Sequence, residues 1–418
     1  MSYCVDISPL DKRVECWRSL FPQLERRVHD RPLVYLDNAA TSLKPRDVIE
    51  AVQQYYLRDN ANVHRANHAL GHASTTVYEE ARKAAARWIG ASSEEEIIFT
   101  AGTTDSINAL ATALSKSYLQ RGDVVLLSEL EHHSNIVPWL ELSQRMGIQL
   151  VYLPIAEDDD RVVKALVEHI ESHRPRLLAV THASNLTGRV LPIERMAEMA
   201  RQFEVPIMVD GAQGVVHHRV DIDKLGLDFY AFSSHKLYGP MGIGVLYIRK
   251  KWHDLLPPFR FGGGMIDEVD YQSVTYAQAP YKYEAGTPHV AGAAGFRAAL
   301  RFLESIHWEE ALTYEQHLLR VAIDALRKVD GIRLLGHEGG SYDPIVSVYA
   351  PGAHHYDLAV LMDQMGVAVR AGHHCVQPYL KKLGLKGTVR ISLAFYNTEE
   401  EVEYCADALK RSLQILTG

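Results

Sequence analysis

The stretch 228-DFYAFSSHKLYGPMGIGVLYIR-249 places two apolar runs on either side of a polar turn that contains Lys236. The runs 229–233 and 243–248 have the composition of buried strands, and the Gly and Pro residues between them interrupt regular structure. Lys236 directly follows one strand, so we expect its amine to face a cleft, where lost hydration lowers an amine's pKa and allows it to form a Schiff base. Taken alone, Lys236 is better explained as a solvated loop lysine.

The sequence before this stretch repeats the same strand pattern. Short β-branched runs alternate with helical patterns from about residue 95 to 250; the runs are EIIFT (96–100), DVVLLS (123–128), IQLVYLP (148–154), RLLAVTHAS (176–184) and PIMVD (206–210). Alternation of this kind predicts an α/β fold with a doubly wound, mostly parallel sheet.

Composition shifts predict the domain boundaries. We expect an N-terminal segment, 1–29, packed on a small domain, then a large domain over 30–290 and a smaller α+β domain over 291–418. The stretch 255–290 carries too many Gly and Pro residues for regular structure, and 291–330 reads as one long helical region.

Charge and cysteine usage exclude several function classes. The net charge is −8 with no basic stripe, so we expect neither nucleic acid nor a membrane as a partner. The start lacks a leader pattern and no 18-residue apolar run occurs, which predicts an intracellular, cytoplasmic protein. The four cysteines lack framework spacing, so neither a disulfide scaffold nor a zinc ribbon is expected.

Polar residues collect where the predicted strands end, which is where open parallel sheets bind ligands. They are Gly102, Thr103 and Thr104 after EIIFT; His132 and His133 after DVVLLS; Ser184 and Asn185 after RLLAVTH; and Asp210 and Gln213 at and after the end of PIMVD. Helix caps or local hydrogen bonds would explain each one singly. Together with Lys236 they supply a phosphate cradle, an amine, a carboxylate and a ring-covering histidine, the groups that pyridoxal 5′-phosphate requires.

With these residues in view, the chain resembles the cysteine desulfurases of the Suf type, in the class V aminotransferase group of fold-type I pyridoxal-phosphate enzymes. The resemblance runs in order from about residue 30 to the end. The segments that carry it are 99-FTAGTTDSIN-108, 131-EHHSNIVPW-139, 181-THASNLTG-188, 209-VDGAQ-213, 233-SSHKLYGPMGIG-244, 284-EAGTP-288, 370-RAGHHC-375 and 390-RISLAFYNTEEEV-402.

The resemblance implies a role for each matching residue. Lys236 would hold the cofactor covalently, Asp210 would pair with its ring nitrogen, and His132 would stack on the ring and donate a proton. The remaining cofactor contacts would come from Gln213 and Asn185 on the phenolic side, from Thr103, Thr104, Ser233 and His235 at the phosphate, and from Thr287 of a partner subunit in a homodimer. Ser234 departs from the glycine that family members often have there.

The substrate end of the site would lie in the C-terminal part of the chain. Arg390 starts a predicted strand after a glycine turn and Arg370 ends one; a guanidinium clamps an α-carboxylate well, although a surface salt bridge would also explain either residue. The resemblance favours Arg390 as the clamp for L-cysteine, with Arg370 and Asn185 in support. His64 and Arg65 match a stretch that approaches the neighbouring subunit's site.

Cys375 is the expected nucleophile, because it alone among the cysteines lies in a loop beside cationic groups. It would take the sulfur as a persulfide for a sulfur-acceptor protein or an iron–sulfur scaffold. The open alternatives with the same cofactor are a selenocysteine lyase, a cysteine sulfinate desulfinase, a transaminase or an epimerase.

Two alternatives of other classes are disfavoured. A metal site at 373-HHC-375 lacks the usual ligand spacing. A non-catalytic scaffold is disfavoured because every position that the chemistry needs is filled.

Overall fold

The computed structural model describes residue 4, residues 10–65 and residues 67–418. The chain forms two compact units, each built from separate segments. Unit 1 consists of 1–46, 183–191 and 301–418, and unit 2 of 47–182 and 192–300. The predicted boundaries at residues 30 and 290 stay predictions, and residues 1–3 and 5–9 of the predicted N-terminal segment lie outside the described part.

Unit 2 contains a seven-stranded sheet in the order β4-β10-β9-β8-β7-β5-β6. The strands are β4 (Ile97–Thr100), β5 (Val124–Ser128), β6 (Gln149–Leu153), β7 (Leu177–Thr181), β8 (Ile207–Asp210), β9 (Phe229–Ser233) and β10 (Gly244–Ile248). The last five in the order are parallel, and β10 runs antiparallel to both β4 and β9. The α/β prediction with a mostly parallel sheet is therefore confirmed.

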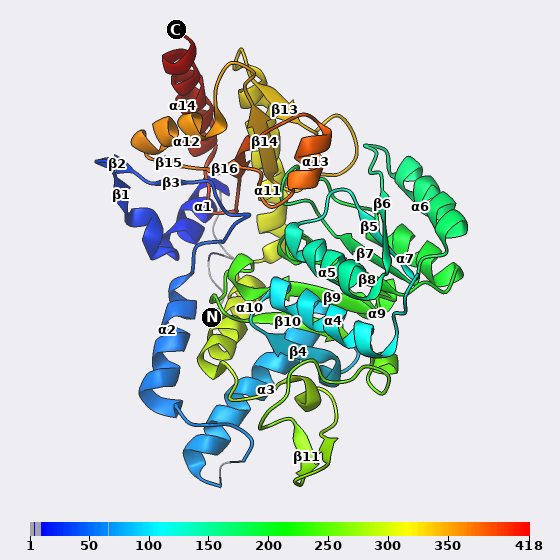
Figure 1. Cartoon of the computed structure of the whole chain (residues 1–418). Coiled ribbons are helices and arrows are strands. Elements are labelled where there is room, and N and C mark those ends of the chain that lie inside the picture. Colours follow the sequence, from blue (N-terminus) through cyan, green and yellow to red (C-terminus); the bar gives the residue numbers. More distant parts are fainter. Residues whose placement is uncertain (1–3, 5–9, 66) are drawn as a thin grey trace. The chain divides into compact units, whose positions relative to one another are not determined.

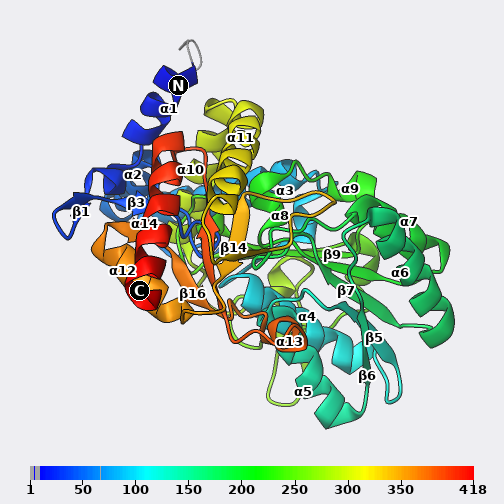
Figure 2. The same cartoon turned by 90° about the horizontal axis from the view of Figure 1, so that it is seen from above.

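Helices cover both faces of this sheet, as the continuous apolar strands require. In Figure 2, α4 and α5 lie on one face, and α6 and α7 lie on the other. The helices of this part of the chain are α2 (Arg46–Gln54), α3 (Ala69–Ile89), α4 (Thr103–Ser117), α5 (Val137–Met146), α6 (Asp159–His173), α7 (Ile193–Gln202), α8 (Gly214–His217), α9 (Ile222–Leu225) and α10 (Val290–Ser305), with single turns η2 (Tyr55–Asp59), η3 (Glu94–Glu96), η4 (His133–Asn135), η5 (Ser234–Lys236), η6 (Lys250–Trp252) and η7 (Tyr281–Tyr283).

The stretch 255–290 differs from its prediction. It contains an antiparallel hairpin, β11 (Ile266–Val269) with β12 (Val274–Tyr276). The carboxylate of Asp270 accepts hydrogen bonds from the N–H groups of Gln272 and Ser273, which stabilises the turn. The hairpin is short and mostly exposed, so no hydrophobic alternation marks it in the sequence.

Unit 1 is built on a four-stranded antiparallel sheet in the order β13-β14-β17-β16 (Figure 1). Its strands are β13 (Arg333–Leu335), β14 (Ile345–Tyr349), β16 (Arg370–Gly372) and β17 (Thr388–Ser392), and its helices are α1 (Leu10–Ser19), η1 (Pro22–Glu25), α11 (Trp308–Arg327), α12 (His355–Gln364), α13 (Gln377–Lys382) and α14 (Glu399–Thr417). Two small sheets complete it: β1 (Arg27–Val28) with β2 (Arg31–Pro32), and β3 (Val34–Tyr35) parallel to β15 (Val367–Ala368).

Aromatic side chains attach the N-terminal helix to the rest of unit 1. Trp17 packs edge-on against Phe395 with ring centroids 5.6 Å apart, and Phe21 lies 4.5 Å from Tyr396. All four side chains are almost fully buried. The predicted helical region over about 291–330 contains two helices, because His307, with φ of 54°, separates α10 from α11.

The segment 183–191 belongs to unit 1 although its neighbours in sequence belong to unit 2. Its backbone pairs with 341–343, through hydrogen bonds from Val190 N to Ser341 O and from Asp343 N to Gly188 O. Gly188 has φ of 78°, and a Cβ there would lie 2.7 Å from the carbonyl oxygens of Asp343 and Ile345. Only glycine fits this close approach.

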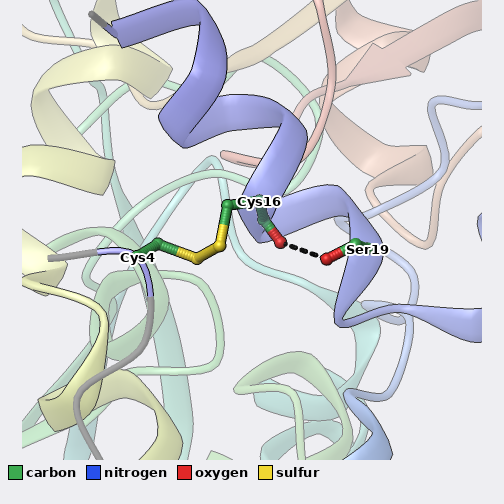
Figure 3. Close-up of a disulfide and its surroundings, with 3 residues drawn as sticks. All are labelled: Cys4, Cys16 and Ser19. Atoms are coloured by element: carbon green, nitrogen blue, oxygen red, sulfur yellow. Dashed lines mark hydrogen bonds between the residues drawn. A yellow bond between two sulfur atoms is a disulfide. The ribbon is translucent and has the colours of Figure 1, made fainter. Parts of the chain in front are cut away.

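The sequence analysis expected no disulfide scaffold, and it did not predict the one disulfide that the described residues contain. Cys4 and Cys16 are joined by a disulfide that ties the N-terminal segment to α1 (Figure 3). The hydroxyl of Ser19 donates to the carbonyl of Cys16 one turn earlier in the same helix. Cys375 and Cys405 remain free.

Among the helices of the described residues, none combines the length and the hydropathy that crossing a membrane requires.

Candidate active site

The start of α4 in unit 2 has the features of an anion site. Gly102 is the N-cap and supplies no side-chain acceptor to the first turn of α4, where helices commonly bind anions. Ser233, at the end of β9, accepts a 2.8 Å hydrogen bond from the N–H of Thr103 and lies 2.8 Å from its hydroxyl. The sheet thus brings together two of the predicted phosphate ligands, Thr103 and Ser233.

A second hydroxyl chain connects α4 to His132. The Thr104 and Ser134 hydroxyl oxygens are 2.6 Å apart, and Ser134 Oγ is 2.9 Å from His132 Nδ1. The backbone N–H of Ser134 also donates to His132 Nδ1, at 3.1 Å. Because Nδ1 accepts this bond, the proton of a neutral His132 resides on Nε2.

Glu131 is a site residue that the sequence analysis did not single out. Its side chain is completely buried and accepts hydrogen bonds from Ser128 Oγ, Asn135 Nδ2 and the N–H of Thr181, the last two at 2.7 Å. Burial raises the pKa of Glu131 to about 8, against the hydrogen bonds of Ser128 and Asn135, which lower it. The sequence did contain a signal for this residue, because Glu131 is a charged residue between an apolar strand and a polar loop.

Asp210 and Lys236 interact electrostatically in unit 2. Asp210 is the last residue of β8, is 3% exposed and accepts a 3.0 Å hydrogen bond from the N–H of Ala212. Burial raises the pKa of Asp210, while that hydrogen bond and the positive charge of Lys236 lower it. Gln213, 2% exposed, is the N-cap of α8, three residues after Asp210.

Lys236 ends the single turn η5, which also contains Ser234 and His235. The Ser234 hydroxyl is buried and makes no hydrogen bond to any described residue. A Cβ on Gly239 would lie 2.0 Å from that hydroxyl, so glycine at 239 accommodates the serine at 234. The departure from the family pattern at Ser234 thus has a local explanation.

These residues fit pyridoxal phosphate. Unit 2 offers a helix N-terminus and hydroxyls for a phosphate at α4, an amine at Lys236, and a buried carboxylate at Asp210 that a cationic partner would stabilise.

Thr287 is exposed and lies in a loop that two cavities share. Cavities of about 180 Å³ and 270 Å³ both have Glu284, Gly286, Thr287 and Pro288 in their walls. His64 and Arg65 line the larger one.

A buried ion pair fixes the base of this loop. Glu284 accepts from Arg82 Nη1 at 2.6 Å and Nη2 at 2.9 Å, from the Tyr78 hydroxyl at 2.7 Å and from the N–H of Phe99 at 2.7 Å. Arg82 is 1% exposed. Thr287 therefore follows an anchored residue by three positions.

Cys375 lies in unit 1 in an unusual backbone conformation. His374 and Cys375 have φ of 50° and 59°, so two successive non-glycine residues are left-handed. Such residues cost about 1–3 kcal/mol each and persist where the surroundings hold them. The N–H of Cys375 donates to His373 Nδ1 at 3.2 Å, and the thiol is partly exposed.

Asn185 and Thr388 hold His374, the residue before the thiol. The side-chain amide of Asn185 donates to the His374 carbonyl at 2.7 Å. The imidazole Nε2 of His374 is 2.9 Å from the Thr388 hydroxyl. Burial, with the charge of Arg390, lowers the pKa of His374 to about 3, so this imidazole is neutral at physiological pH.

Arg370 and Arg390 contact the same carboxylate in unit 1. Asp37 accepts from Arg370 Nε and Nη2 and from Arg390 Nη2, all within 3.1 Å. The predicted strand positions need correction, because Arg370 begins β16 and Arg390 is the third residue of β17. The hydrogen bond to Asp37 raises the pKa of Arg370, whereas burial lowers the pKa of Arg390 against the charge of Asp37. Cys375 interacts electrostatically with both arginines.

Comparisons with known proteins give a consistent result. The model of the aminotransferase class V family matches residues 34–405. A protein of Vibrio cholerae named probable cysteine desulfurase is 42% identical over 399 residues, covering 96% of this chain and 98% of that protein. A cysteine desulfurase of Salmonella newport is 42% identical over 405 residues, covering 96% and 99%.

A solved structure matches over nearly the same length. The crystal structure of the cysteine desulfurase CsdA of Escherichia coli, in an S-sulfonic acid form, has a TM-score of 0.87 and 40% identity, and the match covers 96% of this chain and 99% of that one.

Proposed function

Because the chain belongs to the aminotransferase class V family, we propose that it is a pyridoxal-phosphate-dependent cysteine desulfurase of the Suf type. It converts L-cysteine to L-alanine and holds the released sulfur as a persulfide on Cys375. The observation that carries the proposal is the placement of Cys375 in a held, left-handed loop beside Arg370 and Arg390. The thiolate is the reactive form of cysteine.

The residues of unit 2 bind and orient the cofactor. Thr103, Thr104, Ser233 and His235 would hold its phosphate, and Lys236 would hold it covalently. When bound, pyridoxal phosphate withdraws electrons from the Cα of an amino acid. Asp210 keeps the ring nitrogen protonated, because a buried carboxylate is stabilised by a cation. Gln213 and Asn185 would bind the phenolic side of the ring.

Protons move through two further side chains. Lys236 would accept the proton from the Cα of the substrate. His132 covers the ring and donates from Nε2, the nitrogen that its hydrogen bond with Ser134 leaves protonated.

The residues of unit 1 bind the substrate carboxylate and take the sulfur. Arg390 clamps the α-carboxylate with support from Arg370 and Asn185. The Sγ of Cys375 bonds to the substrate sulfur while the Cβ–S bond breaks, and that electron pair stays with the carbon skeleton. Protonation of the carbon skeleton then gives alanine.

The proposal extends to partners and compartment. The enzyme is a homodimer in which Thr287 contacts the cofactor phosphate of the partner's site, and it passes sulfur to an acceptor protein or an iron–sulfur scaffold. It works in the cytoplasm, where thiols are kept reduced, so the Cys4–Cys16 pair would be open to reduction there.

A direct assay tests the function. Purified protein is incubated with L-cysteine, alanine is measured, and the persulfide is mapped by mass spectrometry; we expect it on Cys375. Cys375→Ala should lower alanine formation at least ~100-fold, an effect typical of losing a nucleophile, whereas Cys405→Ala, at a buried free thiol, should not. Alanine formed at the wild-type rate by Cys375→Ala would refute the assignment. L-selenocysteine and cysteine sulfinate, assayed in parallel, distinguish the related activities.

A further inference from the structure

Arg370 and Arg390 face each other across two neighbouring strands. They are direct partners in the antiparallel register of β16 and β17. Like charges directly opposite each other destabilise a sheet. Arg390 is 2% exposed, whereas 49% of the Arg370 side chain is exposed, so the charge of Arg390 has the greater need of a partner.

Asp37 supplies the compensating charge to both arginines. Its Oδ1 accepts from Arg390 Nη2 at 3.0 Å, and its two oxygens accept from Arg370 Nε and Nη2 at 2.9 to 3.1 Å. The backbone holds Asp37 in place, because it follows β3 by two residues and bridges Ser392 of β17. One carboxylate thus fixes two guanidinium groups.

The same contact orients Arg390. Its Nη1 donates to the Asn185 carbonyl at 2.9 Å, and its Nη2 donates to Asp37. Two contacts at two nitrogens define the plane of the guanidinium. The buried Nε donates to no described residue, so it is available to a further anion.

We propose that Asp37 is a positioning residue for the substrate: by neutralising Arg370 and fixing the plane of Arg390, it presents Arg390 to the α-carboxylate. This rests on the proposed function, since it takes that carboxylate as the anion that Arg390 binds. Asp37 acts through the arginines and does not itself touch the substrate. Without its charge, the two guanidinium groups repel each other and Arg390 loses its fixed plane.

The test compares a ligand that has a carboxylate with one that lacks it. Holoenzyme is titrated with L-alanine and with ethylamine, and binding is followed by cofactor absorbance. In Asp37→Asn, we expect the Kd for L-alanine to rise about tenfold or more, as for loss of a charge-assisted contact, and the Kd for ethylamine to change less than about twofold. The KM for L-cysteine should rise similarly, with kcat within about threefold. Asp407→Asn, at an exposed pair with Arg411, is the control.

A conservative variant separates positioning from folding. Asp37→Glu, which keeps the charge, should bind L-alanine at least about threefold more tightly than Asp37→Asn. No recovery in Asp37→Glu, or equal weakening for both ligands, overturns the proposal. If wild-type protein forms no alanine from cysteine while the L-alanine titrations behave as expected, the proposed function fails and the role of Asp37 stands.

Discussion

The side-chain amide of Asn185 donates a 2.7 Å hydrogen bond to the carbonyl oxygen of His374, the residue directly before Cys375. The backbone carbonyl of Asn185 in turn accepts from Arg390. One residue therefore contacts both the loop of the proposed nucleophile and the proposed carboxylate clamp. Asn185 therefore helps to fix the distance between the Cys375 loop and Arg390.

Asn185→Ala should loosen the Cys375 loop. The buried carbonyl of His374 loses its donor, which costs about 1–3 kcal/mol, and the two left-handed residues lose one of the contacts that hold them. We expect a lower free energy of unfolding and faster hydrogen exchange at residues 372–376. Asn108→Ala is the matched control, because Asn108 also donates to a carbonyl, that of Thr104, but is exposed. Unchanged exchange at 372–376 would show that Asn185 does not hold the loop.

Glu284→Gln should destabilise the protein strongly. Arg82, 1% exposed, would keep a buried charge with its main partner gone, and breaking such a pair costs about 3–5 kcal/mol. Guanidinium denaturation at fixed protein concentration measures the loss. Asp407→Asn, at an exposed pair, should cost under about 0.5 kcal/mol. Similar losses in both variants would contradict a special role for the buried pair.

Glu131→Gln should change how stability depends on pH. The folded pKa of about 8 lies above the unfolded value of 4.5, so the folded state binds the extra proton between these values. The contribution of Glu131 is fully present below pH 4.5 and is lost as pH rises through about 8. As the pH rises from 5 to 8, the Tm of the wild type should therefore fall relative to the Tm of the variant. Parallel Tm curves would place the Glu131 pKa outside this range.

The Cys4–Cys16 disulfide should be visible in thiol counts. Of four cysteines, two are paired and two are free. Purified protein that is denatured without reductant and alkylated should carry two alkyl groups, at Cys375 and Cys405, and four after reduction. Four groups without reductant would mean that the pair is reduced in the isolated protein.

The sequence predicted the sheet of unit 2 well, because each buried strand is a local apolar run and each helix has its own period. It missed Asp37, although 33-LVYLD-37 ends an apolar run with a carboxylate just as 206-PIMVD-210 does. Arg390, which donates to Asp37, is 353 residues away in the sequence, and no local pattern predicts such a contact.

Other differences have similar causes. The hairpin of β11 and β12 lacks a buried face, so its strands carry no alternation to detect. The break at His307 depends on one backbone angle in a residue that helices tolerate. The hydrogen bond from Asn185 to His374 was not predicted, because the position of Asn185 after a strand indicated a ligand-binding residue and not one that supports a loop.

The pairing of β3 with β15 has a consequence for how the chain is made. Val34 of β3 pairs with Val367 of β15, so the segment of β3 is translated 333 residues before its partner. The strand pairs of unit 1 cannot be completed on a nascent chain until almost the whole protein has been translated, whereas the sequence of unit 2 is complete at residue 300. Asp37 and its two arginines therefore come together last, and ribosome-bound chains expose the unpaired edge of β3 for most of translation.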